Sequence, residues 1–161
     1  MLQPKDNRVT GQKIEPLTPD FVEHNQKQRN WVKGHFVDNA DENYATIEGK
    51  LRLLETITRE KWIEPHETWK LQALGITFGD ALAQMLNMEW VTVTDEYGVA
   101  PALRYPGTTI LTYPLTTISK RIEDGEEVHV HELFGQFCDR IEHLARFGPP
   151  TEDGLMKSET H

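Results

Sequence analysis

The helix predicted over residues 69–86 is the feature that most constrains how this chain folds. Its apolar face consists of residues at helical spacing: Leu71, Leu74, Phe78, Leu82 and Met85. A second line along the same helix carries Gly75, Gly79 and Ala83. Each glycine inside a helix costs about 0.5–1 kcal/mol relative to alanine. Two of them four residues apart therefore predict close approach by another backbone, with a ligand pressed against the glycines as the alternative.

Three short strand-like runs follow this helix, at residues 89–94, 101–105 and 108–113. In the first run, Trp90, Thr92 and Thr94 alternate with Val91 and Val93, which is the pattern of a strand with two different faces. The runs are separated by turn signals, Asp-Glu-Tyr-Gly ending at Gly98 and Pro-Gly at 106–107. We expect an antiparallel meander of three or four strands, with the helix of residues 69–86 covering one face.

The rest of the chain completes an α+β fold. Thr18-Pro19 starts a helix predicted to run to about residue 36, and a second is predicted over residues 41–61. A short amphipathic helix follows the meander, and a C-terminal helix from Val130 ends at Gly148. The sequence thus predicts N-terminal helices, a three- to four-stranded meander backed by a long helix, and a C-terminal helix. Residues 17–147 form one domain between a flexible arm (1–16) and a flexible tail (148–161).

Amino-acid composition and net charge indicate which kinds of molecule the protein is expected to bind and where it is expected to be located. The chain has 161 residues, 37% hydrophobic and 27% charged, with a net charge of −9. That acidity disfavours nucleic acid and favours a basic protein partner. Cys138 is the only cysteine, which fits a reducing compartment. We see no secretory leader and no apolar run long enough for a membrane helix, so the expected location is cytoplasmic. No cofactor is predicted.

The residues predicted to bind a partner lie on the meander. Trp90, Arg104 and Tyr105 are candidates to line a sheet face that the helices leave open. Arg104 sits mid-strand, where a half-buried guanidinium needs a partner. The structural interpretation is an ion pair with Asp95 or Glu96 across the hairpin. The functional interpretation is an arginine that binds an anion or carboxylate. An open sheet face would serve equally as a dimer surface, so a homo-oligomer remains open.

The turn at Asp95, Glu96 and Tyr97 is the second candidate. Turn chemistry accounts for Asp95 and for Gly98, whereas a tyrosine beside two carboxylates suits a binding surface. An acid/base pair is the third interpretation, but adjacent carboxylates in a tight turn diverge into solvent.

His129 and His131 are the weak candidates for a metal site. In a strand, residues two apart share a face and can chelate a metal. If Val130 already belongs to a helix, the two imidazoles point in different directions at the water-exposed N-terminus of that helix. Cys138 is expected to be a buried, inert thiol on the core side of its helix.

A combination of short segments resembles domain-of-unknown-function family 3806. These segments include EWVTVTDEYG, ALRYPGTTILTYPLTTISKRIEDGE and VHELF, within residues 71–144. The resemblance implies a small bacterial α+β domain and brings no activity, cofactor or catalytic residue. One departure is His129, where the residue that opens the last helix is often acidic in the family.

Three functions follow, in order of preference. The first is a non-catalytic protein-binding module, similar to an immunity protein or antitoxin that neutralises a basic toxin. The second is a small-molecule or anion sensor that uses the open sheet face around Arg104. The third is a metal-dependent enzyme at His129 and His131, ranked last because no third ligand is identified.

Overall fold

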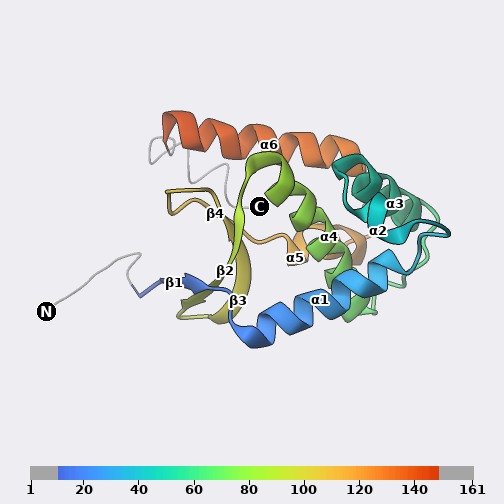
Figure 1. Cartoon of the computed structure of the whole chain (residues 1–161), viewed down its shortest axis with the longest axis horizontal. Helices are drawn as coiled ribbons and strands as arrows, with labels where there is room; N and C mark the ends of the chain where they lie inside the picture. The colour runs from blue at the N-terminus through green and yellow to red at the C-terminus, as the bar shows by residue number, and fades with distance from the viewer. Residues whose placement is uncertain (1–10, 149–161) are drawn as a thin grey trace, which may run out of the picture.

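The computed structural model describes residues 11–148, which form an α+β fold (Figure 1). The elements in chain order are β1 (Lys13–Pro16), α1 (Pro19–Lys33), α2 (Ala40–Tyr44), α3 (Ile47–Arg59), α4 (Thr68–Leu86), β2 (Glu89–Asp95), β3 (Gly98–Arg104), β4 (Leu111–Thr112), α5 (Leu115–Glu123) and α6 (Val130–Phe147). This confirms the predicted fold class, including the long helix and the C-terminal helix.

The sheet has four antiparallel strands in the order β1-β2-β3-β4. Strands β2, β3 and β4 are the predicted meander. The fourth strand, β1, comes from the segment predicted to be a loose arm, so that prediction is wrong for residues 13–16. Pairing along the edge of β2 supplies the partners that a short polar segment lacks by itself, with Ile14 opposite Val93. Residues 1–10 of the predicted arm and 149–161 of the predicted tail lie outside the described residues.

Helix α4 is the centre of the fold, with α6 on one side, α1 on the other and the sheet at one end (Figure 1). Gly75 makes the predicted close contact with another backbone, whereas Gly79 meets side chains. A Cβ on Gly75 would lie 2.4 Å from the carbonyl oxygen of Pro114, and one on Gly79 would lie 2.7 Å from the Trp90 ring. The backbone entering α5 and the indole of β2 thus occupy the space that the missing side chains leave. Phe78, on the apolar face, is fully buried in the main core.

One predicted helix is divided in the structure. The helix predicted over residues 41–61 is divided into α2 and α3, because Thr46 caps a new helix by accepting a hydrogen bond from Gly49 N at 2.9 Å. Helix α4 starts within one residue of the prediction, and the residues before it form a turn, closed by a 3.0 Å bond from Glu67 N to Glu64 O. The predicted Thr18 cap of α1 is confirmed by a 3.3 Å bond from Phe21 N.

The centre of the sheet face opposite α4 is apolar and buried. Val91, Val93 and Ala102 are 1%, 2% and 0% exposed, and Ile14 and Leu111 pack against them. By strand alternation these residues lie on the face opposite Trp90 and Leu103, which belong to the main core. The centre of the face that was expected to be partly open is therefore buried, whereas its rim at Ile14, Glu89 and Leu111 is half-buried or exposed.

Candidate functional site

Two of the predicted binding residues are partly buried and pack against the core. The Trp90 ring packs on Gly79 beneath α4, and its Nε1 donates a 3.0 Å hydrogen bond to Asp80. Tyr105 packs against the main core as well. Both side chains lie on the sheet face that meets the main core, and Trp90 contacts α4 directly.

Arg104 forms an ion pair, but with a different partner from the predicted one. Its Nε and Nη2 donate to Glu89 at 3.1 and 2.6 Å. Glu89 lies directly opposite on β2, whereas Asp95 is at the far end of that strand, about 20 Å away by strand rise. The predicted pair with Asp95 or Glu96 is therefore wrong, because the register places those residues at the hairpin tip.

The hairpin tip has the predicted turn chemistry. Asp95 accepts a 2.8 Å hydrogen bond from Tyr97 N, and Gly98 has a φ of +132°. Tyr97 is 89% exposed, and hydrogen bonding to Glu96 together with its charge raises the pKa of the Tyr97 phenol. The six predicted binding residues are thus divided among the edge of the core, the end of β3 and the hairpin tip. A binding role for the tip stays a prediction.

A buried polar network, which the sequence did not predict, joins α4 to α1, α2 and β2. Asp80 accepts two bonds from Arg29 at 2.5 and 2.9 Å, one from Tyr44 at 2.6 Å and one from Trp90 at 3.0 Å. Burial and the charge of Asp80 raise the pKa of Tyr44. All four donors converge on one carboxylate, so its role is structural. One sequence feature could have indicated this network: Asp80 is the only charged residue between Lys70 and Glu89.

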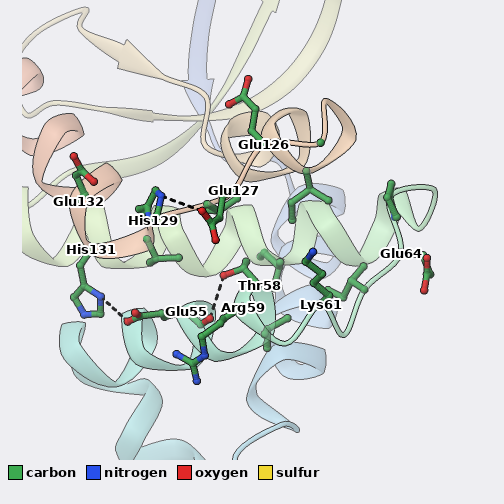
Figure 2. Close-up of a pocket in the computed structure, with 18 residues that line it drawn as sticks. Glu55, Thr58, Arg59, Lys61, Glu64, Glu126, Glu127, His129, His131 and Glu132 are labelled. Atoms are coloured by element: carbon green, nitrogen blue, oxygen red, sulfur yellow. Dashed lines mark hydrogen bonds and ion pairs between the residues drawn. The ribbon is translucent and has the colours of Figure 1, made fainter.

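A groove of about 640 Å³ lies between α3, the turn after it and the connection from α5 to α6 (Figure 2). Its apolar lining consists of Ile57, Ile63, Leu74, Ile122, Val128 and Val130. Its carboxylates are Glu55, Glu64, Glu126, Glu127 and Glu132, against two permanent cations, Arg59 and Lys61. We call this feature the acidic groove. An apolar lining with excess carboxylates can hold an apolar group and a cation side by side.

The two candidate histidines lie in the acidic groove but point to different partners. His131 Nε2 lies 3.3 Å from Glu48, and its Nδ1 lies 3.0 Å from Glu55, both on α3. His129 Nε2 lies 3.6 Å from Glu127 in its own segment. In Figure 2, His131 and Glu127 point toward α3, whereas Glu126 points away from it. Val130 is the first residue of α6, which explains why the imidazoles diverge.

The described part of the chain offers little support for metal or thiol chemistry. Within residues 11–148, no group of three or more histidine, cysteine, aspartate or glutamate side chains is placed to hold a metal ion. The predicted burial of Cys138 is confirmed, and burial raises the pKa of its thiol to about 11. None of the helices in this range is long and apolar enough to cross a membrane.

Comparison with known proteins identifies the family. Residues 50–134, more than half of the chain, match the family described as "Domain of unknown function (DUF3806)". The chain belongs to this family, as the sequence segments predicted. The match includes α3 from Lys50 onward, α4, the β2–β3 hairpin and the start of α6, and thus most of the acidic groove.

A solved structure has a similar fold. A crystal structure of a protein from Bacteroides thetaiotaomicron VPI-5482 is 19% identical, with a TM-score of 0.68. The match covers 80% of this chain but 48% of that protein, so the chain spans about half of its length. At this identity the likeness concerns the fold alone. No functionally curated protein matches the chain.

Proposed function

We propose that this protein is a non-catalytic protein-binding module whose acidic groove accepts a basic segment of a partner protein. The observation that carries the proposal is the combination, in one groove, of an apolar lining with five carboxylates and only two permanent cations. A segment with lysine or arginine beside an apolar residue complements both features. The apolar side chain would be desolvated on the lining while the cation meets a carboxylate.

The whole chain favours the same partner chemistry. Its net charge of −9 attracts a basic protein and accelerates the encounter, whereas it repels a phosphate backbone. A neutraliser of a basic toxin, similar to an immunity protein or antitoxin, is the specific form of this proposal.

A small molecule is the second candidate, supported by the size of the groove. A volume of about 640 Å³ is within the range of ligand pockets. The lining favours a cationic molecule with an apolar body. The earlier candidate, an anion sensor at Arg104, has less support because Glu89 already neutralises that guanidinium.

A binding titration with charge-reversed variants tests the proposal. The probe is a short labelled peptide of alternating lysine and leucine, with a glutamate–leucine peptide as the negative probe. Glu64→Lys combined with Glu127→Lys should weaken binding by at least about tenfold, since two opposite charges become like charges. The matched control is Glu23→Lys with Glu142→Lys, which makes the same change in net charge on exposed positions of α1 and α6.

The outcomes separate the alternatives. Equal weakening by the groove pair and the control pair would mean that net charge alone attracts the probe, and would contradict a groove site. Copurification with the products of neighbouring genes then identifies the natural partner. A partner lost from the groove variant but retained by the control variant is the expected result. Stabilisation by a small cationic molecule, with no protein partner bound, would favour the second candidate.

A further inference from the structure

We propose that Glu48 and Glu55 form the cation-binding subsite of the acidic groove, and that His131 occupies this subsite in place of a partner's lysine or arginine. This inference rests on the proposed function and specifies which contact the partner makes. The partner segment would place its cation between the two carboxylates, displace His131, and lay a neighbouring apolar side chain on the groove lining.

The geometry of His131 carries the inference. Its two ring nitrogens lie 3.3 Å from Glu48 and 3.0 Å from Glu55, so one imidazole joins two carboxylates. Glu48 and Glu55 are seven residues apart on α3, which places them two turns apart on one face of the helix. Glu55 also lines the groove, and Glu48 lies two turns earlier on α3, just outside the lining. The subsite and the apolar lining are therefore within reach of one short segment.

The contact is accessible and easily exchanged. The side chains of His131, Glu48 and Glu55 are 44%, 65% and 45% exposed. Ion pairs with this much exposure contribute little to stability, because water screens them. A partner cation can therefore replace the imidazole without opening the core. Arginine suits the position, since its guanidinium is always charged and presents several donors to carboxylates.

The neighbouring charges leave the two carboxylates available to a partner. Arg59, on the same helix, forms its ion pair with Glu60 at 3.4 Å. Lys50 turns to the opposite side, where its Nζ donates to Gln84 at 2.7 Å. His129 approaches Glu127 in its own segment. Among the residues that the structure describes, His131 is thus the nitrogen-bearing side chain that approaches both Glu48 and Glu55.

Affinity measurements on His131 variants test the inference with the lysine–leucine peptide and an arginine–leucine peptide as probes. His131→Ala should bind both peptides about two- to fivefold more tightly, because no internal group competes for the carboxylates. Glu48→Gln with Glu55→Gln should weaken binding by at least about fivefold. His143→Ala, an exposed histidine later on α6, is the matched control and should leave affinity unchanged.

A second readout distinguishes displacement from a structural effect. The imidazole nitrogen signals of His131 should shift on addition of peptide to the wild-type protein, as the ring leaves its carboxylates, while those of His143 stay in place. His131→Gln serves as a milder variant, and urea unfolding of each variant reports whether α6 is still folded.

Unchanged or weaker affinity in folded His131→Ala overturns the inference. If the Glu64/Glu127 reversal still abolishes binding in that experiment, the proposed function stands without this subsite. If neither set of variants alters binding, or if the wild-type protein binds neither peptide, both proposals fail.

Discussion

Replacing Asp80 by asparagine should destabilise the protein strongly, although the two side chains have nearly the same shape. The Asp80 carboxylate accepts four hydrogen bonds, two of them from Arg29. An asparagine keeps one oxygen and turns an NH2 group toward donors, so at least one donor loses its acceptor. It also leaves the Arg29 charge without a counter-ion, and both side chains are largely buried, at 20% and 13% exposed.

The size of the effect follows from the burial of the pair. Breaking a buried ion pair from one side costs about 3–5 kcal/mol. We expect the lower end, about 3 kcal/mol, because one fifth of the Arg29 side chain still reaches water. For a chain of this length, each kcal/mol lowers Tm by about 2–4 °C, so Tm should fall by about 6–12 °C.

Urea unfolding followed by tryptophan fluorescence measures this loss, and Trp90 reports on it directly because its indole bonds to Asp80. Asp41→Asn is the matched control. Asp41 also pairs with a lysine, Lys33, but its side chain is 88% exposed, and the change should stay within about 0.5 kcal/mol. A loss below about 1 kcal/mol for Asp80→Asn would refute the view that this network holds α4 to its neighbours.

Three further predictions concern the packing and the charges. Gly75→Ala should destabilise the fold by about 1–2 kcal/mol in urea unfolding, since its Cβ would meet backbone atoms including Leu115 Cα at 2.6 Å. Gly135→Ala, in a helix with free space around it, should instead stabilise by about 0.5–1 kcal/mol; the reverse order would contradict the packing. The pKa of the Tyr44 phenol is raised in the folded state above its ordinary value of 10. The protonated phenol therefore contributes fully to the free energy of unfolding below pH 10, and this contribution is lost as pH rises further. Stability should therefore fall less steeply above pH 10 in Tyr44→Phe than in the wild type, and parallel pH curves would refute this. Arg104→Ala should change the unfolding free energy by only about 0–1 kcal/mol, and a larger loss would show that its surface ion pair is undervalued.

The fold was predictable to the extent that it depends on local patterns. The glycines of α4, the Thr18 cap and the hairpin turns each have a local signature, and all three are confirmed. The strand β1 was not predictable, because four residues without apolar alternation become a strand only by pairing with the edge of β2. The break at Thr46 was missed because its apolar neighbours keep helical spacing on both sides.

The candidate site was harder to predict because it depends on tertiary contacts. The sequence identified His129 and His131 but associated them with a metal, since spacing alone does not show that α6 faces α3. Glu48 and Glu55 share a helix face by spacing, yet their partner is 76 to 83 residues away in the chain. Arg104 was expected to pair at the wrong end of the hairpin, because the strand register was not known.

Mapping the bound lysine–leucine peptide by backbone chemical-shift changes tests the central claim most directly. The account predicts that the changes concentrate on α3 and on residues 125–132, which line the acidic groove, with the signals of Glu96 and Tyr97 unaffected. Chemical-shift changes centred on the hairpin tip or around Arg104, with no change at the residues of the acidic groove, would contradict this account. They would place the binding site on the meander instead.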